Sequence, residues 1–402
     1  MIENVFELSP EQLRDIAITF QTKFEKGLTE ENTEIQCLPT YISPERTVCN
    51  GRSLVLDLGG TNYRAAIVDF NNGEVTMHPK DGWKKKLEIM KTPGFTREQL
   101  FQEQADLISE IDHEQELPIG YCFSYPAESL LNGDARLLRW SKGVDIPEMI
   151  GQPVGKPLME YMAARGIARF SSVKVINDTV ASLFAGLSDQ GYDAYIGLIV
   201  GTGTNMATFI PRERIPKLNP GYTGQDWIPV NLESGNFYPP YLTEFDNEVD
   251  ERSISAGKQR FEKAVSGMYL GELFKAVFAE ECDQKEFTAK DLNYIVNNPE
   301  LYKGDFVLMA DWIFERSARL VAASLAGMIL TLKNIDPDIR RICLTAEGSL
   351  FWSNMAHGRD YSEIVLDEMY GILRGLGYLD IKVDVEEKRN INLIGTALAA
   401  LS

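Results

Sequence analysis

The chain has 402 residues, 44% of them hydrophobic, and its 59 acidic and 40 basic residues give a formal net charge of −19. The length favours two or three domains over one, and the apolar fraction suffices for sizeable cores. The acidic balance argues against nucleic acid or an anionic membrane as a partner, because both bind basic surfaces. It leaves room for a small polyanionic substrate, which a few local donors can hold.

Five scattered cysteines, none in a CxxC pair, argue against a disulfide scaffold or a structural zinc site and favour a reducing compartment. The acidic N-terminal residues show no signal-peptide pattern, and no apolar run is expected to be long enough to cross a membrane. A cytoplasmic protein is therefore expected. The three histidines, His78, His113 and His357, lie outside the glycine-rich motifs, so a carboxylate is the expected proton acceptor.

Apolar periodicity, caps and turns predict an alternation of strands and helices. Ser9-Pro10 starts a helix within residues 4–27, and the turn Asn71-Asn-Gly73 closes a hairpin. Further strands are expected at 53–58, 63–70, 74–78, 118–125, 173–176, 194–200, 205–210, 342–344 and 381–385. Further helices are expected at 96–111, after Asn177, and at 257–280, 288–297, 304–334, 360–376 and 391–401, with long loops over 211–250. This alternation implies α/β layers with mixed sheets.

Two similar glycine turns are the most informative motifs. Asp57-Leu-Gly-Gly-Thr-Asn-Tyr-Arg64 and Gly201-Thr-Gly-Thr-Asn205 each follow one apolar strand and precede another. Glycines permit a tight turn and the close approach of a ligand, while threonine hydroxyls and backbone N–H groups can donate to phosphate oxygens. A plain hairpin turn is the competing interpretation, but it does not explain the carboxylate of Asp57, which could hold magnesium beside the phosphates. The pair predicts a duplicated nucleotide-binding architecture.

The other polar motifs each have a structural and a functional interpretation. Asn177-Asp-Thr179 can be a helix cap, or it can place a carboxylate at the carboxyl end of a strand, where ligands of open α/β sheets bind. Gly348-Ser349 is expected to open a helix, either as an N-cap or as a phosphate-binding N-terminus. Taken alone, Trp140-Ser-Lys-Gly143 and Glu233 are typical of solvated loops, and Glu262 is expected off the core face of its helix.

In this order the motifs resemble those of the hexokinase family over most of the chain. The two glycine turns are similar to the family's two phosphate segments. The segments similar to its sugar site are Phe123-Ser-Tyr-Pro126, Trp140-Ser-Lys-Gly143 and Ile176-Asn-Asp-Thr-Val180. The most family-specific stretch is Gly257-Lys-Gln-Arg-Phe-Glu-Lys263, continuing as Ser266-Gly-Met-Tyr-Leu-Gly-Glu272.

The resemblance implies an α/β fold of duplicated ribonuclease H-like domains, as in actin-like ATPases, with mixed sheets flanked by helices and two lobes around a sugar cleft. It implies a small domain of residues 51–176 plus about 387–402, and a large domain of residues 1–50 and 177–386. The chain is shorter than a typical eukaryotic catalytic unit, which favours a short bacterial-type hexokinase.

The resemblance also implies transfer of the ATP γ-phosphate to the 6-hydroxyl of a hexose, with Mg²⁺, by a monomer or homodimer. Glucose is the first candidate, followed by mannose and fructose. Asp178 would be the general base, Arg64 a second catalytic residue, and Asp57 the residue that orients hydrated magnesium. The sugar would be bound by Ser124, Ser141, Lys142, Asn177, Asn205, Glu233 and Glu262. The nucleotide would be bound by Asp57, Gly59, Gly60, Thr61, Asn62, Gly201, Thr202, Gly203, Gly348 and Ser349.

Two segments depart from the family pattern. The family commonly has Thr-Glu-Trp-Gly-Ala-Phe where this chain has Leu232-Glu-Ser-Gly-Asn-Phe237, and Asp-Gly-Ser where it has Glu347-Gly-Ser349. Two other classes of protein stay open. A non-catalytic sugar sensor could use the same scaffold, although Asp178, Thr61 and Arg64 argue against it. A chaperone-type or cytoskeletal ATPase would hydrolyse ATP without sugar and would not need the Ser-Lys-Gly and Asn-Asp-Thr segments.

Overall fold

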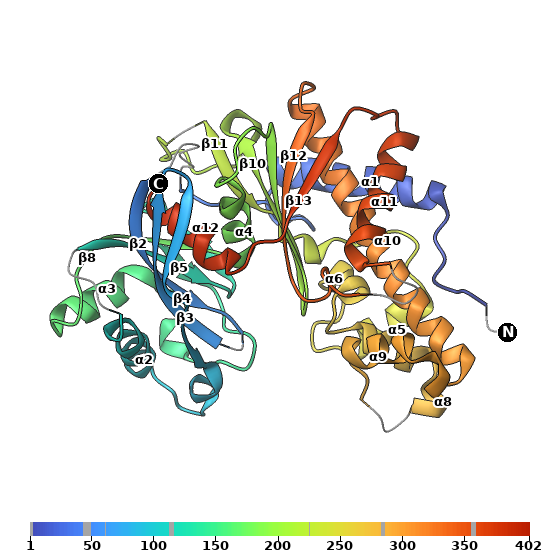
Figure 1. Cartoon of the computed structure of the whole chain (residues 1–402), viewed down its shortest axis with the longest axis horizontal. Helices are drawn as coiled ribbons and strands as arrows, with labels where there is room; N and C mark the ends of the chain where they lie inside the picture. Colours follow the sequence, from blue (N-terminus) through green and yellow to red (C-terminus); the bar gives the residue numbers. More distant parts are fainter. Residues whose placement is uncertain are drawn as a thin grey trace.

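A computed structural model describes residues 3–42, 50–60, 62–111, 116–224, 226–282, 286–354 and 359–402. They form two lobes, each built around one mixed sheet (Figure 1). The strands are β1 (Leu38–Pro39), β2 (Asn50–Leu58), β3 (Asn62–Asn71), β4 (Glu74–Lys86), β5 (Leu117–Phe123), β6 (Ala127–Ser129), β7 (Ala135–Leu137), β8 (Phe170–Ile176), β9 (Ala194–Val200), β10 (Thr204–Pro211), β11 (Trp227–Asn231), β12 (Arg341–Glu347) and β13 (Lys382–Glu386). The helices are α1 (Pro10–Thr29), α2 (Arg97–Ser109), α3 (Gly155–Ala164), α4 (Asp178–Gly186), α5 (Glu244–Arg252), α6 (Arg260–Val265), α7 (Leu270–Val277), α8 (Ala279–Cys282), α9 (Ala289–Asn297), α10 (Gly304–Ile335), α11 (Tyr361–Gly375) and α12 (Ile391–Ala400).

The two sheets repeat one topology. In the small lobe the strand order is β4-β3-β2-β5-β8, and in the large lobe it is β1-β11-β10-β9-β12-β13. In each, an antiparallel meander (β2–β3–β4 or β9–β10–β11) is followed by two strands that run parallel to the first strand of the meander. The predicted duplicated α/β fold with mixed sheets is therefore confirmed.

Two helices, α4 and α12, lie between the sheets (Figure 1). Helix α4 follows the last strand of the small-lobe sheet but packs on β9 and β12 of the large lobe, and α12 follows β13 but packs on β5 and β2. The two helices also contact each other closely, because a Cβ on Gly395 would come within 1.7 Å of the Ala181 carbonyl oxygen. The two lobes thus meet at a pair of tightly packed helices.

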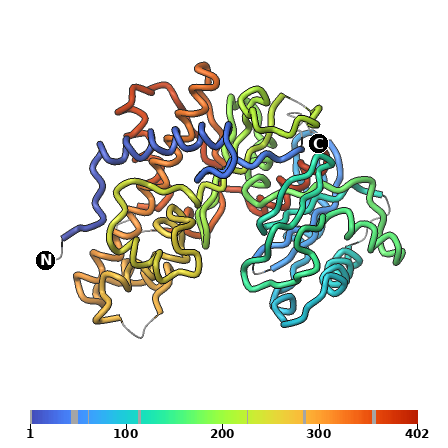
Figure 2. The backbone as a smooth tube through the Cα atoms, turned by 180° about the vertical axis from the view of Figure 1, so that it is seen from behind, coloured from blue at the N-terminus to red at the C-terminus, as the bar shows by residue number. Residues whose placement is uncertain are grey.

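The long helix α10 forms the centre of the large lobe, with α1 and α11 packed along it (Figure 2). It is long and apolar enough to span a membrane by length and composition, which the sequence-based expectation had excluded, but 83% of its apolar window is buried inside the lobe. Helix α1 begins as predicted, with Pro10 in its first turn and Ser9 in a capping box with Gln12.

Three sequence-based predictions about elements were wrong. The single helix expected over 257–280 is three short helices, α6, α7 and α8. The stretch 211–250, expected to be loops, contains β11 and most of α5. Gly348-Ser349 does not open a helix; residues 349–352 form turns, with the Phe351 N–H donating to the Val200 carbonyl at 3.0 Å. In each case long-range contacts decide the conformation.

Candidate functional site

The carboxyl ends of three parallel strands bring the small-lobe candidates to one edge of their sheet. Asp57 on β2 is in register with Cys122 on β5, which is in register with Ile176 on β8. The next residues along these strands lead into the first glycine turn, into Ser124 and into Asp178. This is the edge at which ligands of open α/β sheets gather.

Asp57 and Arg64 form a largely buried ion pair. They are cross-strand partners on β2 and β3, and Arg64 donates to Asp57 Oδ2 from Nη2 at 2.7 Å and from Nε at 3.1 Å. Arg64 Nη1 also donates to Asn390 Oδ1 at 3.2 Å. Burial raises the pKa of Asp57 above its ordinary value, the negative charge of Asp178 adds to this, and Arg64 opposes it.

The first glycine turn lies against two predicted sugar-site segments. The Gly59 N–H donates to the Asn62 carbonyl at 3.1 Å, and the Tyr125 hydroxyl donates to the Gly59 carbonyl at 3.1 Å. The Lys142 stem covers Gly60, where a Cβ would come within 2.7 Å of Lys142 Cδ, and Lys142 Nζ donates to the Ser124 carbonyl at 2.7 Å. Ser141 is held in the same turn as Lys142, its carbonyl accepting from the Val144 N–H at 3.2 Å. Thr61 lies outside the described residues, as do His113 and His357.

Asn177 and Asp178 begin α4, and here the cap interpretation is confirmed. Asn177 is the N-cap residue, and its Oδ1 accepts the Thr179 N–H at 2.9 Å; Asp178 Oδ1 accepts the same N–H at 2.9 Å. The cap does not exclude a functional role, because the second carboxylate oxygen of Asp178 is not used by these bonds. Both side chains remain partly exposed.

In the large lobe, the side chains of Asn205, Asn231 and Glu233 form a chain of hydrogen bonds. Asn205 Nδ2 donates to Asn231 Oδ1 at 2.7 Å, and Asn231 Nδ2 donates to Glu233 Oε1 at 2.8 Å. Glu233 has the left-handed backbone φ of 54° and starts a short 3-10 turn at Ser234, whose N–H donates to Asn205 Oδ1 at 3.1 Å. Burial raises the pKa of Glu233, and the negative charge of Asp178 raises it further. The hydrogen bond from Asn231 and the positive charges of Arg139 and Lys142 lower it. Glu233 is therefore a fixed, partly buried group and not a solvated loop residue.

Glu262 also belongs to this cluster. It lies on α6, and its Oε2 accepts the Thr204 N–H at 3.0 Å while Oε1 accepts from Gln259 Nε2 at 3.1 Å. A Cβ on Gly203 would come within 2.6 Å of Glu262 Oε2. Burial raises the pKa of Glu262, the neighbouring charge of Glu233 also raises it, and the Thr204 N–H lowers it. Glu262 is therefore a fixed, partly buried group and not the solvated charge that a position off the core face usually indicates.

The second glycine turn and Gly348-Ser349 lie together. The Gly201 N–H donates to the Gly203 carbonyl at 2.9 Å, and a Cβ on Gly201 would come within 3.2 Å of Gly348 Cα and 3.7 Å of Ser349 N. Gly348 has a φ of +116°, and a Cβ there would lie 2.1 Å from the Val200 carbonyl oxygen. The Thr202 carbonyl accepts the Met268 N–H at 3.3 Å. The predicted second phosphate segment thus forms one compact group with the residues after β12.

Glu347, which sequence reasoning did not place in the site, faces the same carboxylates. Its side chain accepts from Ser182 Oγ at 3.5 Å and from Asn392 Nδ2 at 3.4 Å. Burial, followed by the charges of Asp178 and Asp57, raises the pKa of Glu347 from 4.5 to about 7, while Arg64 lowers it. Its place in the altered Glu347-Gly-Ser349 segment, at the end of a strand, was the available signal.

These carboxylates fit a hydrated magnesium ion. The charges of Asp57, Asp178 and Glu347 act on one another, with one guanidinium, Arg64, to offset them. Within the described ranges no group of three or more His, Cys, Asp or Glu side chains could hold a metal ion alone. Mg²⁺ commonly keeps several waters and binds through one or two carboxylates together with substrate phosphates. An ion held jointly with a triphosphate matches this donor set.

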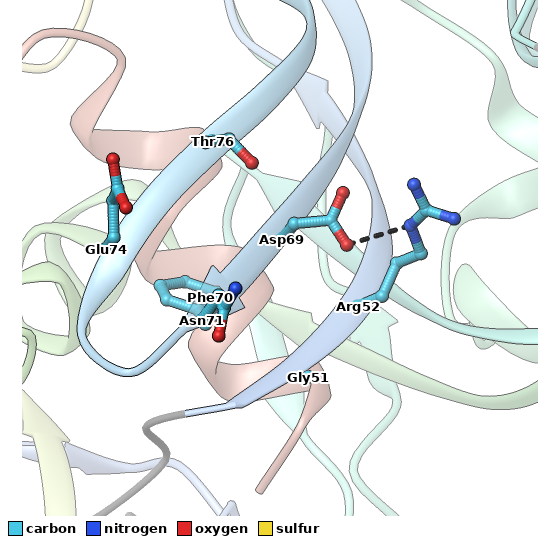
Figure 3. Close-up of a pocket in the computed structure, with 7 residues that line it drawn as sticks. All are labelled: Gly51, Arg52, Asp69, Phe70, Asn71, Glu74 and Thr76. Atoms are coloured by element: carbon cyan, nitrogen blue, oxygen red, sulfur yellow. Dashed lines mark ion pairs between the residues drawn. The ribbon is translucent and has the colours of Figure 1, made fainter.

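Two surface hollows lie elsewhere. One of about 530 Å³ is at the ends of β2, β3 and β4 near the β3–β4 turn, where Arg52 is paired with Asp69 beside Glu74 and Thr76 (Figure 3). The other, of about 410 Å³, is lined by Phe287, Tyr294 and Phe306 among others. Neither contains a predicted site residue, so the site is defined by the hydrogen bonds and charges above.

Comparisons with known proteins find hexokinases by sequence and by structure. Two family models, both described as hexokinase, match residues 1–187 and 195–310. Hexokinase-2 of Equus caballus is 35% identical over 293 residues, which are 68% of this chain and 31% of that protein. Hexokinase-3 of Rattus norvegicus is 31% identical over 347 residues, which are 81% of this chain and 36% of that protein. The chain therefore spans about a third of the length of these curated relatives.

Solved structures show the same fold. The hexokinase from Schistosoma mansoni complexed with glucose has a TM-score of 0.77 at 22% identity, covering 99% of this chain and 97% of that one. The ROK hexokinase from Thermus thermophilus has a TM-score of 0.56 at 19% identity, covering 87% of this chain and 98% of that one. Together with the two family models and the sequence relatives, this fold shows that the chain belongs to the hexokinase family.

Proposed function

We propose that this protein is an ATP-dependent hexokinase that transfers the γ-phosphoryl group to the 6-hydroxyl of a hexose, with glucose as the first candidate and mannose and fructose as others. One observation carries the proposal. Asp178 follows β8 at the sheet edge where β2 leads into the first glycine turn and β5 leads into Ser124, and its charge raises the pKa of Asp57, Glu347 and Glu233. Asp178 thus stands between a phosphate-type and a hydroxyl-type environment.

The amide and carboxylate cluster suits a sugar. Each sugar hydroxyl is both a donor and an acceptor. Adjacent hydroxyls can each form hydrogen bonds with side chains of this cluster, which are Asn177, Asn205, Glu233 and Glu262. Each of these side chains is fixed by a hydrogen bond within the protein and is partly buried. An analogue that lacks a hydroxyl would therefore leave their remaining polar atoms unpaired. Ser124, Ser141 and Lys142 would contact the sugar from the small lobe.

The glycine turns suit a triphosphate. Gly59, Gly60 and Asn62, with Thr61, would surround its oxygens from one lobe, and Gly201 to Gly203 with Gly348 and Ser349 from the other. Arg64 would offset negative charge that develops during transfer. Asp57 would orient hydrated Mg²⁺, which when bound supplies charge neutralisation to the phosphates.

In the proposed reaction Asp178 accepts the proton of the 6-hydroxyl as that oxygen forms its bond to the γ-phosphorus. The bond from phosphorus to the β,γ-bridging oxygen breaks, and ADP leaves with that electron pair. An aspartate is basic enough, since phosphoryl transfer requires placement and charge stabilisation more than a strong base. The proton can therefore leave late in the step.

We also propose the domain division 51–176 plus about 387–402 against 1–50 plus 177–386. The strand orders support it, because each sheet is formed by strands of one division. A cytoplasmic enzyme completes the proposal, and the scattered cysteines are the support for that compartment. The short bacterial type and the monomeric or homodimeric state rest on the family resemblance.

A panel of sugars assayed with magnesium-ATP tests the proposal. ADP formation that requires glucose, mannose or fructose, with the phosphate recovered on the 6-position by phosphorus NMR, would support it. As a matched control, 6-deoxyglucose should compete with glucose but accept no phosphate. ATP hydrolysis without sugar would instead indicate a chaperone-type ATPase, and glucose binding without ADP formation would indicate a sugar sensor.

A further inference from the structure

Asp250, on α5, lies at the centre of a buried charge cluster outside the predicted site. Its Oδ1 accepts from Lys263 Nζ at 2.6 Å, and its Oδ2 accepts from Arg260 Nη1 at 3.1 Å and from the Gly257 N–H at 2.8 Å. The Lys263 and Asp250 side chains are only 2% and 6% exposed. One carboxylate thus anchors three donors of a neighbouring segment.

These donors belong to the segment that carries Glu262. Arg260 and Lys263 flank Glu262 on α6, and Gly257 precedes the helix. Lys263 Nζ also donates to the Ser255 carbonyl at 2.8 Å, so both ends of the segment are bound to the same group. Among the described residues, Asp250 accepts hydrogen bonds from the residues around Glu262 and none from Glu262 itself.

Helix α6 needs this support. It has six residues, far fewer than an isolated helix requires in water, and begins after Gln259 in the left-handed conformation without a side-chain cap. The Phe261 N–H donates to the Phe237 carbonyl at 2.8 Å, which fixes one side of the helix. The Asp250 cluster fixes the charged side.

The support is directed at two parts of the candidate site. Glu262 accepts the Thr204 N–H, and just beyond α6 the Gly267 N–H donates to the Gly201 carbonyl at 2.7 Å. A shift of α6 would therefore move the Glu262 carboxylate relative to the second glycine turn.

We propose that Asp250 is a positioning residue for hexose recognition, which it supports by anchoring α6 so that Glu262 stays beside the Thr204 N–H. This inference rests on the proposed function, in which Glu262 contacts the sugar. Burial alone would raise the pKa of Asp250, but the hydrogen bonds from Lys263 and Gly257 and the charge of Arg260 hold it below its ordinary value. The carboxylate is therefore ionised at neutral pH, as the two cations require.

A double-mutant cycle separates positioning from a general structural role. Glucose affinity is measured by calorimetry, without nucleotide, for wild type, Asp250→Asn, Glu262→Gln and the double variant. Acting through Glu262, Asp250→Asn should weaken glucose binding about tenfold or more in the wild-type background and less than about twofold in the Glu262→Gln background. The control is Asp134→Asn, which changes another buried carboxylate with three donors, the N–H groups of Ala135, Gly155 and Lys156, in the small lobe. It should keep the wild-type affinity.

The outcomes distinguish the inference from the function on which it rests. If wild type neither binds nor phosphorylates glucose, mannose or fructose, the proposed function fails. If wild type binds and phosphorylates one of them, an unchanged affinity of Asp250→Asn for that sugar, or equal losses in both backgrounds, overturns the positioning role. Should Asp250→Asn fail to fold, Asp250→Glu, which keeps the charge and displaces it by one methylene, goes through the same cycle under the same criteria.

Discussion

Arg64 binds Asp57 across β2 and β3 in the same way that Arg52 binds Asp69 on the same two strands, but only the first pair is buried. Each pair is in direct cross-strand register, with N–O distances of 2.7 and 2.8 Å. The arginine side chain is 22% exposed at Arg64 and 53% exposed at Arg52. The chain therefore contains its own comparison between a site ion pair and a surface ion pair.

Removing each arginine should have very different effects on stability. Arg64→Met leaves a buried carboxylate unpaired among other carboxylates and should cost about 3–5 kcal/mol of unfolding free energy. Arg52→Met should cost no more than about 1 kcal/mol, because Arg52 is half exposed and Asp69 keeps contact with water. Urea unfolding of both variants measures this. Equal, small shifts of the two urea midpoints would mean that the Asp57–Arg64 pair stabilises the fold no more than the surface pair does.

Asp178→Asn should abolish most of the turnover and leave the sugar bound. The amide oxygen can still accept the Thr179 N–H, so the start of α4 is retained, but the side chain can no longer take a proton. General-base assistance is worth ~10²–10⁴ in rate, and kcat should fall by at least that order. Steady-state kinetics and glucose calorimetry measure the two effects, and a kcat within tenfold of wild type would remove Asp178 from the role.

Glu347 should give the protein a pH-dependent stability. The pKa of Glu347 in the folded protein is raised to about 7 from 4.5, so the folded state binds a proton that the unfolded state has released in that range. This contribution is fully present below about pH 4.5 and is lost as pH rises through about 7, with a total on the order of 3 kcal/mol. The difference in unfolding free energy between wild type and Glu347→Gln should change over that window. A difference that is flat from pH 4.5 to 8 would contradict the assignment.

Gly203→Ala should impair sugar use while leaving the fold nearly intact. The new Cβ would meet Glu262 Oε2 at 2.6 Å, and the end of a flexible side chain can move away at little cost. The displaced carboxylate loses the Thr204 N–H and its predicted sugar contact, and the hexose KM should rise about tenfold or more.

The matched control for Gly203 is Gly371→Ala on α11, where an added Cβ meets nothing within 4 Å. It should leave the hexose KM unchanged and stabilise the protein by about 0.5–1 kcal/mol, because alanine favours a helix more than glycine does. If both variants have the wild-type KM, Glu262 is not held where we place it.

Local chemistry made much of the fold predictable. The capping box of Ser9, the hairpin turn Asn71-Asn-Gly73 and the two glycine turns each depend on neighbouring residues, and all are where the sequence placed them. The cross-strand spacing of Asp57 and Arg64 also follows from one hairpin. Such features need no knowledge of distant contacts.

The parts that could not be predicted depend on distant contacts. Helix 257–280 is interrupted because Gly267 approaches the Gly201 carbonyl and Gln259 turns the chain before α6. Glu262 is fixed by a hydrogen bond from the Thr204 N–H, which is 58 positions away in the sequence. Glu347 stands out in the sequence only as a departure from the family pattern, and Asp250 has an ordinary local sequence. The charged neighbours of each come from strands and helices that meet in the fold.

The most direct test of the account is a crystal structure with glucose and a non-hydrolysable ATP analogue bound together. The account predicts that an Asp178 carboxylate oxygen lies within hydrogen-bond reach, about 2.6–3.2 Å, of the glucose 6-hydroxyl, with the triphosphate between the turns at Gly59 and Gly201. Glucose seated away from Asp178, or a triphosphate that contacts neither turn, would contradict it.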